Sequence, residues 1–142
     1  MKATWPLDAR WEAHDRHRAL TIAASAGVAV AALLAALGLP PWDMHGPLHY
    51  AGIMDPLCGA TRSVRHTFRA ELASAWRYNP LGPVLAVGAI ALLARGLAGL
   101  TTRRWLTLRI RWSTPLVLAL LALTVALEIR QQARAELLTS VP

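Results

Sequence analysis

One short stretch of this chain gathers most of the residues whose side chains could do chemistry. Residues 52–63 read GIMDPLCGATRS and contain the only cysteine, Cys58, three residues after the carboxylate of Asp55. The same stretch places Thr61 and Arg62 shortly after a glycine. A thiol beside a base can act as a nucleophile, and an arginine beside backbone N–H groups can hold a phosphate. These are the first two kinds of chemistry to weigh.

Catalysis by Cys58 would need a base, and three histidines could supply one: His45, His49 and His66. Nothing in the sequence fixes their geometry relative to the thiol. An apolar loop also raises the pKa of a thiol, which disfavours the reactive thiolate. The sequence therefore assigns no catalytic residue and favours a protein that is not an enzyme.

Phosphate binding has a more specific basis. Arg62 would lie at the start of a helix, where backbone N–H groups and the helix dipole favour an anion. Arg65 and Arg69 follow it at helical spacing. These three arginines are the candidates for contact with a lipid headgroup. The structural alternative is that Arg62 pairs with Asp55 or Glu71 and fixes the loop on the helix.

The composition indicates that lipid surrounds most of the chain. Hydrophobic residues make up 55% and charged residues 16%, whereas a soluble domain carries about 25% charged residues. The net charge of +7 comes mainly from arginines that flank long apolar runs. That placement is typical of orientation signals and headgroup contacts, so we expect lipid partners and no nucleic acid. The single cysteine excludes an intramolecular disulfide.

Three long apolar runs predict transmembrane helices. They lie at residues 19–39, 79–100 and 114–130. The first has no charge in twenty-one positions, and such a length matches a hydrocarbon core of about 30 Å. Its small residues at helical spacing, Ala24, Gly27 and Ala31, predict close packing on another span. Arg95, near the end of the second run, is expected to extend to the lipid headgroups.

Polar or glycine- and proline-rich segments join these helices. They are a polar N-terminal segment at 1–18, a loop with the motif at 40–58, a basic loop at 101–113 and a C-terminal tail at 131–142. We expect the tail to be a helical extension that frays. Residues 59–78 predict an amphipathic helix with one apolar face and one arginine-rich face. Because it is too polar to span a bilayer, it is expected to lie in the membrane interface.

The distribution of cations predicts the orientation. The segments on the N-terminal side of the spans carry eight cations, and those on the Cys58 side carry six. Positive residues concentrate on the cytoplasmic side, so we expect a cytoplasmic N-terminus and an outer Cys58 loop. The fold class predicted is an all-α integral membrane protein with three transmembrane helices and one interfacial amphipathic helix.

The order of the motif residues is similar to that of a bacterial membrane-protein family. The run DPLCGATR at residues 55–62 is followed by an amphipathic helix and then by YNPL at residues 78–81. The family, called domain of unknown function twenty-seven fifty-two, has the pattern C-P-x-C-G-x-T-R, then a helix, then N-P before an apolar segment. The resemblance covers roughly residues 45–100 and implies a bacterial membrane location and a site, with no established reaction. The motif residues that it implies are Asp55, Pro56, Cys58, Gly59, Thr61, Arg62, Asn79 and Pro80.

The departures from this pattern suggest a metal site. Asp55 stands where the family has its first motif cysteine, and His45 and His49 stand near the place of a further upstream cysteine. Cysteine, aspartate and histidine replace one another mainly as metal ligands. The resemblance therefore prompts the hypothesis of a small zinc site formed by these residues and Cys58. The alternative is that Asp55 caps the following helix while Cys58 packs as a small apolar residue.

These observations favour a non-enzymatic function. The leading hypothesis is a structural or accessory subunit of the bacterial cell membrane that packs against a partner complex or against itself. The alternative is a protein that binds a metal ion or a lipid headgroup at the loop around Asp55, Cys58 and Arg62. The sequence identifies neither the partner nor the biological process.

Overall fold

The computed structural model describes residues 7–39 and 50–139 of the chain. Three of its helices are long and apolar enough to cross a membrane, which confirms the three predicted spans. They are α1 at Arg18–Leu37, α5 at Leu81–Thr102 and α6 at Thr114–Gln132. Few residues of these helices are buried against protein, as expected where lipid is the solvent. The helices indicate a multi-pass membrane protein.

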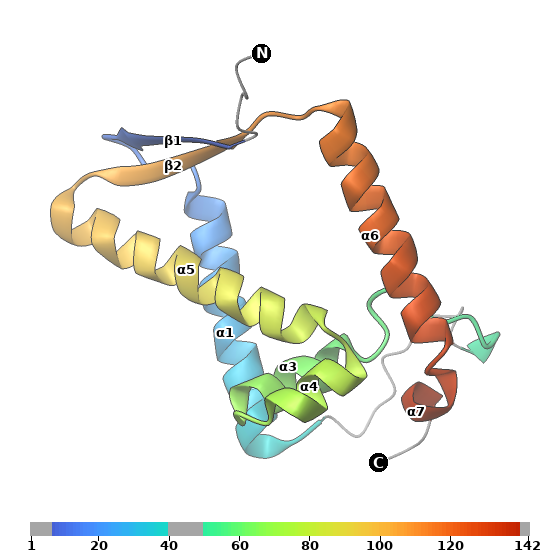
Figure 1. Cartoon of the computed structure of the whole chain (residues 1–142). Coiled ribbons are helices and arrows are strands. Elements are labelled where there is room, and N and C mark those ends of the chain that lie inside the picture. The colour runs from blue at the N-terminus through green and yellow to red at the C-terminus, as the bar shows by residue number, and fades with distance from the viewer. Residues whose placement is uncertain (1–6, 40–49, 140–142) are drawn as a thin grey trace.

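The shorter elements gather at the two ends of these helices (Figure 1). Two strands, β1 at Leu7–Glu12 and β2 at Trp105–Ile110, lie at the end where α1 begins; we call this the sheet end. Three short helices lie at the other end, which we call the motif end. They are α3 at Ala60–Phe68, α4 at Leu72–Tyr78 and α7 at Ala135–Thr139. The chain thus passes between the two ends three times.

Small residues bring α1 and α5 together. Ala24 and Ala31 are buried, as predicted for the small-residue face of α1. A methyl group added at Gly96 of α5 would lie 2.9 Å from the Thr21 side chain of α1, so the glycine allows the close approach. Gly27 has nothing within 4 Å of the place where a Cβ would lie. The packed face is therefore narrower than the sequence predicted.

The prediction of an all-α fold was wrong at the sheet end. The polar N-terminal segment and the basic loop each contain a strand, and the two strands pair antiparallel with Leu7 opposite Ile110 and Glu12 opposite Trp105. The signal was present in the sequence, because LDARWE and LTLRI both alternate apolar and polar residues. An alternation with a period of two is typical of a strand with two different faces.

The predicted single helix at 59–78 is two helices, α3 and α4, because the chain turns at Ala70. Ala70 has a left-handed φ of +59°. Its N–H donates to the Thr67 carbonyl at 3.0 Å, and the Glu71 N–H donates to the His66 carbonyl at 2.9 Å. This pair of bonds is a Schellman motif, which ends a helix and is usually formed with glycine. The Glu71 carboxylate also pairs with His66 and Arg69, so the break is fixed by side chains as well.

Replacing Ala70 by glycine is expected to stabilise the protein, by up to about 1 kcal/mol. A left-handed residue with a Cβ costs about 1–2 kcal/mol, and the greater freedom of glycine in the unfolded chain offsets part of that gain. The midpoint of thermal unfolding in detergent micelles should rise. The same change at the exposed Ala73 inside α4 is the matched control and should lower it. A fall for both variants would contradict the strain assigned to Ala70.

The C-terminal tail packs on the motif end, contrary to the prediction that it frays. Leu138 of α7 is 2% exposed and lies in a buried core with Met54 and Cys58. Tyr78 and Ala135 pack against this core. The last turn of α6 leads directly into α7, so the third span is attached at its C-terminal end.

Candidate functional site

The motif asparagine is the centre of the hydrogen bonding at the motif end. Asn79 is fully buried, and its Nδ2 donates to the carbonyls of Pro56 and Cys58, each at 3.0 Å. Its Oδ1 accepts the N–H of Leu81 at 2.9 Å, at the first residue of α5. Pro80 between them has no N–H that would need a partner. The Asn-Pro pair therefore starts the second span and holds the motif loop against it.

A second buried amide comes from α6. Gln131 is fully buried, and its Nε2 donates to the carbonyls of Cys58 and Tyr78, the latter at 3.0 Å. The Cys58 carbonyl thus accepts hydrogen bonds from two side chains. Asn79 lies just before the start of α5, and Gln131 lies at the end of α6. A buried carbonyl without such partners would cost about 1–3 kcal/mol. The last turn of α6 consequently completes the motif loop.

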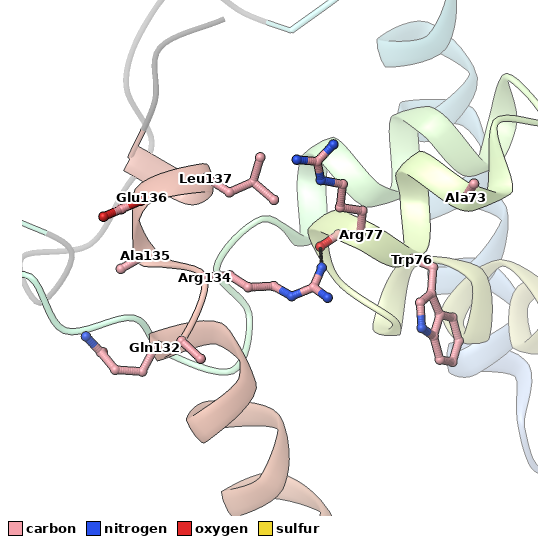
Figure 2. A pocket seen from close by; sticks show the side chains of 9 residues that line it. Ala73, Trp76, Arg77, Gln132, Arg134, Ala135, Glu136 and Leu137 are labelled. Atoms are coloured by element: carbon pink, nitrogen blue, oxygen red, sulfur yellow. Dashed lines mark hydrogen bonds between the residues drawn. The ribbon is translucent and has the colours of Figure 1, made fainter.

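The carbonyls at the end of α4 are satisfied by residues at and just after the end of α6. Figure 2 shows one of these bonds, from Arg134 to the Arg77 carbonyl. Arg130 Nη2 donates to the Trp76 carbonyl and Arg134 Nη1 to the Arg77 carbonyl, both at 2.6 Å. The last four carbonyls of a helix have no partner within it. Three of the four in α4 are therefore capped by residues 130–134, which also bring positive charge to the negative end of the helix dipole.

The Ala75 carbonyl, which accepts the Asn79 N–H at 3.0 Å, also contacts a hydroxyl of α3. Ser63 is fully buried, and its Oγ lies 2.7 Å from the Ala75 carbonyl oxygen and 2.5 Å from the Asn79 carbonyl oxygen, so its one proton is shared between the two acceptors. A methyl group added at Gly82 of α5 would lie 2.1 Å from this hydroxyl. Close packing of α3, α4 and α5 thus depends on small residues at Ser63, Ala75 and Gly82.

Gly59 is required for two independent reasons. Its φ is +76°, in the left-handed region that L side chains rarely adopt. A Cβ at this position would also lie 2.6 Å from Leu138 Cδ2 and 3.2 Å from the Tyr78 carbonyl oxygen. The motif glycine therefore both turns the loop and leaves room for α7.

Replacing Gly59 by alanine should destabilise the protein by at least about 1–2 kcal/mol, the usual cost of a left-handed alanine, with the clash against Leu138 in addition. The double variant Gly59→Ala/Leu138→Ala removes the side-chain clash but keeps the backbone strain. Thermal unfolding is compared for the wild type, the two single variants and the double variant. The double variant should lose less stability than the two single variants lose in sum. Simple additivity would show that Gly59 and Leu138 do not meet.

Asp55 closes a turn, so the alternative in which it caps α3 was wrong. Its Oδ1 accepts the Leu57 N–H at 2.7 Å, and its carbonyl accepts the Cys58 N–H at 3.0 Å. The N-cap of α3 is Gly59, with no side-chain cap. Burial, the largest effect, raises the pKa of the Cys58 thiol; a backbone hydrogen bond at Asp55 opposes this, and the Asp55 carboxylate adds to it. Cys58 therefore stays protonated near neutral pH and packs as an apolar residue, as the alternative to a metal site expected.

The zinc hypothesis stays a prediction. Asp55 and Cys58 lie close together in one turn, but His45 and His49 lie outside the described residues. Among residues 7–39 and 50–139, no group of three histidine, cysteine, aspartate or glutamate side chains is placed to hold a metal ion.

The arginines of α3 have three different environments. The Arg62 guanidinium lies over the Tyr78 ring at 5.8 Å and pairs with no carboxylate of the described residues, so the alternative in which it pairs with Asp55 or Glu71 was wrong. Arg69 bonds to the Glu71 carboxylate at 2.9 Å. Arg65 has a buried Nε with no hydrogen-bond partner in the described part of the chain. Thr61 is exposed.

Glu71 holds His66 and Arg69 in place at the end of α3. Hydrogen bonds from His66 and then from Arg69 lower the pKa of its carboxyl group, against a smaller opposing effect of burial. His66 in turn stacks on the Tyr78 ring at 5.2 Å between centroids. The polar face of the predicted amphipathic helix is therefore largely occupied by contacts within the protein.

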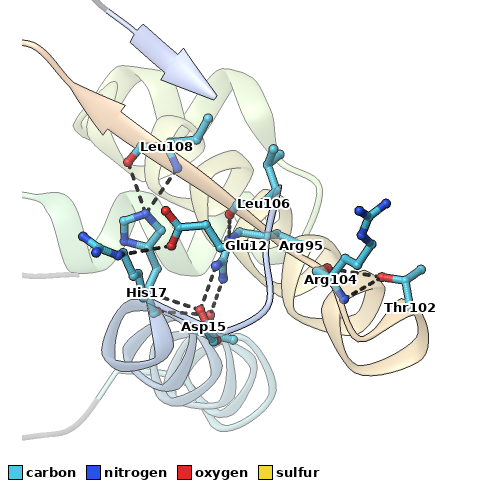
Figure 3. A network of polar contacts seen from close by, with 10 residues as sticks. Glu12, Asp15, His17, Arg95, Thr102, Arg104, Leu106 and Leu108 are labelled. Atoms are coloured by element: carbon cyan, nitrogen blue, oxygen red, sulfur yellow. Dashed lines mark hydrogen bonds and ion pairs between the residues drawn. The ribbon is translucent and has the colours of Figure 1, made fainter. Parts of the chain in front are cut away.

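A separate polar network fastens the sheet end (Figure 3). Arg95 Nη2 of α5 donates to Asp15 Oδ1 at 2.7 Å, and its Nε donates to the Leu106 carbonyl of β2. The side chains of Arg95 and Asp15 are 7% and 13% exposed. Arg95 was predicted to extend to the lipid headgroups, and instead it forms an ion pair inside the protein. The guanidinium also lies 5.7 Å from the centre of the Trp105 ring, and its Nη1 donates to Thr21 Oγ1 of α1 at 3.4 Å. One side chain of α5 therefore joins β2 and α1.

Sequence reasoning missed the residues of the α6 end, Arg130, Gln131 and Arg134. Their one signal is a run of polar side chains, RQQAR, directly after an apolar span. Such a run reads as an ordinary membrane boundary. Only the fold shows that it caps a helix more than fifty residues earlier in the chain, at a separation of 53 for Gln131 and Tyr78.

Comparison with known proteins supports the motif. No curated protein and no solved structure matches the chain. The model of a family described as protein of unknown function (DUF2752) matches residues 48–93. This range contains the motif residues 55–62, α3, α4 and the first part of α5, but not the end of α6 that completes the site. The resemblance seen in the motif is thereby confirmed: residues 48–93 of this membrane protein are similar to the DUF2752 family.

Proposed function

We propose that the protein is a structural or accessory subunit of a complex in a bacterial membrane. Its third span, α6, packs against a helix of the partner. The arrangement of α6 supports this proposal. Its C-terminal end is fixed to the motif loop by Gln131, and to the end of α4 by Arg130 and the following Arg134. The rest of the helix has no buried residue, and its large apolar side chains are exposed: Leu118, Leu120, Leu121, Leu123 and Val125. A rigidly mounted helix with open faces is suited to receive a partner.

The carboxylate of Glu128 favours a protein partner over lipid alone. Glu128 lies within α6, about one turn before its end, and is exposed. It forms no ion pair or hydrogen bond with any residue in the described ranges. Ionisable residues in spans are costly and usually have a partner. A cation on the partner helix would compensate this charge.

The position of Arg95 strengthens the proposed orientation. Its guanidinium lies at the sheet end, bound to Asp15, so that end carries nine cations and the motif end six. By the same distribution rule, the sheet end is cytoplasmic, and the motif loop and α7 are on the outer side. A reporter enzyme that is active only outside the cytoplasm should be active when fused after residue 142.

Site-directed photocrosslinking tests the partner. A photoreactive amino acid at Leu121 of α6 should give one discrete protein adduct in intact membranes. The same label at Val30 of α1, which is equally exposed at 54% against 57%, is the matched control and should react with lipid only. An adduct of twice the monomer mass would identify a second copy as the partner. Loss of any protein adduct at Leu121, or equal adducts at both sites, would contradict the proposal.

A headgroup or metal site at the motif loop is the second candidate function. The unpartnered, buried Nε of Arg65 favours the headgroup form, because a guanidinium N–H binds an anion and such buried donors usually have a ligand or water. Metal analysis of the purified protein tests the zinc form of this candidate. Stoichiometric zinc that disappears in Cys58→Ser would support it, and zinc-free protein with an intact fold would exclude it.

A further inference from the structure

An open cavity of about 790 Å³ lies between α4 and the junction of α6 with α7 (Figure 2). Its walls combine cationic, aromatic and apolar side chains. The lining residues that matter are Trp76, Arg77, Arg134, Glu136 and Leu137. The cavity adjoins the point where the apolar run of α6 ends, so it lies at the edge of the membrane at the motif end.

The charge of this cavity is not balanced within the described protein. Arg77 and Arg134 line it, Arg130 lies one turn before Arg134, and Glu136 is the one carboxylate among the lining residues. None of the three arginines forms an ion pair with a described residue. Neighbouring cations repel one another, and an anion between them would remove that repulsion.

The two lining arginines differ in how much of their hydrogen bonding is already used. Arg134 Nη1 donates a hydrogen bond to the Arg77 carbonyl at 2.6 Å. The Arg77 guanidinium makes no hydrogen bond with any described residue, because only the backbone carbonyl of Arg77 is engaged. Figure 2 shows the Arg77 side chain extending from α4 and the Arg134 side chain extending toward α4 from the junction of α6 with α7. An arginine with free N–H groups binds a phosphate through two parallel hydrogen bonds.

The surroundings select a lipid over a free anion. Trp76 is 56% exposed beside the arginines, and indoles favour the headgroup level of a bilayer. The exposed apolar surface of α6 continues from the cavity toward the membrane interior. We propose that this cavity binds the phosphate of an anionic phospholipid. Arg77 and Arg134 contact the phosphate, Trp76 lies beside the glycerol, and the acyl chains follow α6.

Native mass spectrometry of the full-length protein tests this site. Detergent-solubilised protein is titrated with phosphatidylglycerol, with the zwitterionic phosphatidylcholine in a parallel series. Arg77→Gln should weaken phosphatidylglycerol binding about fivefold, the effect of one arginine–lipid contact. Arg111→Gln removes the same charge at the sheet end and should leave binding unchanged. Because the Arg77 side chain bonds to no described residue, its loss leaves the cap on the Arg77 carbonyl intact.

Each other outcome overturns the proposal. Equal binding of the two lipids, or equal loss in Arg77→Gln and Arg111→Gln, would show general attraction instead of a site. Displacement of phosphatidylglycerol by millimolar inorganic phosphate would assign the cavity to a soluble anion. A lower unfolding midpoint of lipid-free Arg77→Gln would attribute its effect to folding. These results leave the proposed packing of α6 on a partner untouched, because that rests on other residues.

Discussion

Arg95→Ala is expected to destabilise the protein by about 3–5 kcal/mol, the usual cost of removing one partner of a buried ion pair. The substitution leaves the Asp15 carboxylate buried without its cation and removes the donor to the Leu106 carbonyl. Because this one guanidinium joins β2 to α1 and α5, the strands should separate from the spans. Thermal unfolding in detergent micelles measures the loss, and amide hydrogen exchange of residues 105–110 locates it.

The control for this prediction is an ion pair of the same type on the surface. Arg10 and Asp8 lie 2.9 Å apart with side chains 66% and 39% exposed, and such pairs contribute at most about 1 kcal/mol. Arg10→Ala should therefore be nearly neutral. A similar effect of both substitutions would contradict the structural role of Arg95.

Acid should weaken the ion pair between Arg95 and Asp15 and so lower the stability of the protein. Burial alone would raise the pKa of Asp15, but the hydrogen bond from Arg95, helped by the His17 N–H and the positive charges, lowers it below the ordinary value of 3.8. A carboxyl group with a lowered pKa in the folded state contributes stability that is present above about pH 4 and lost as the pH falls through the lower, folded value. Asp15→Asn should remove this part of the acid sensitivity.

Asn79→Ala is expected to have an effect of similar size at the motif end, about 3–5 kcal/mol. It leaves the Pro56 carbonyl and the Leu81 N–H without their partners and removes one of two donors from the Cys58 carbonyl. Each buried group left without a partner costs about 1–3 kcal/mol. Thermal unfolding in micelles measures the total.

A nearly isosteric variant separates hydrogen bonding from packing. Asn79→Asp keeps the volume and the acceptor for the Leu81 N–H, but replaces two donors by an oxygen that faces the carbonyls of Pro56 and Cys58. It should therefore destabilise the protein about as much as alanine. A stable aspartate variant would show that the asparagine only fills space.

The transmembrane helices could be predicted because a lipid bilayer imposes one simple constraint on the sequence. A bilayer accepts only segments whose side chains are apolar on every face, and such runs are visible in one dimension. The burial of Ala24 and Ala31 followed from the same reasoning about close helix packing. The sheet was missed although its alternation is regular, because the arginines of 101–113 were interpreted only as orientation signals.

The candidate site was predictable in its position but not in its construction. The motif residues were identified from their resemblance to a family, yet their partners come from a distant segment: Gln131 lies 73 positions after Cys58. Nothing local indicates that a glutamine after an apolar run reaches a loop so far back. The end of α3 was equally hidden, because alanine at a left-handed position has no signature in the sequence.

The central claim is that the end of α6 completes the motif loop, and two adjacent glutamines allow a direct measurement. Gln131 is fully buried and donates to the Cys58 carbonyl, whereas Gln132 is exposed and bonds only to the start of the loop, at the Met54 N–H and the Gly52 carbonyl. Hydrogen exchange of residues 57–63, which excludes the amide bonded to Gln132, is compared in Gln131→Ala and Gln132→Ala. The structure predicts a large loss of protection in the first variant and little change in the second. Equal protection in both variants would contradict the claim.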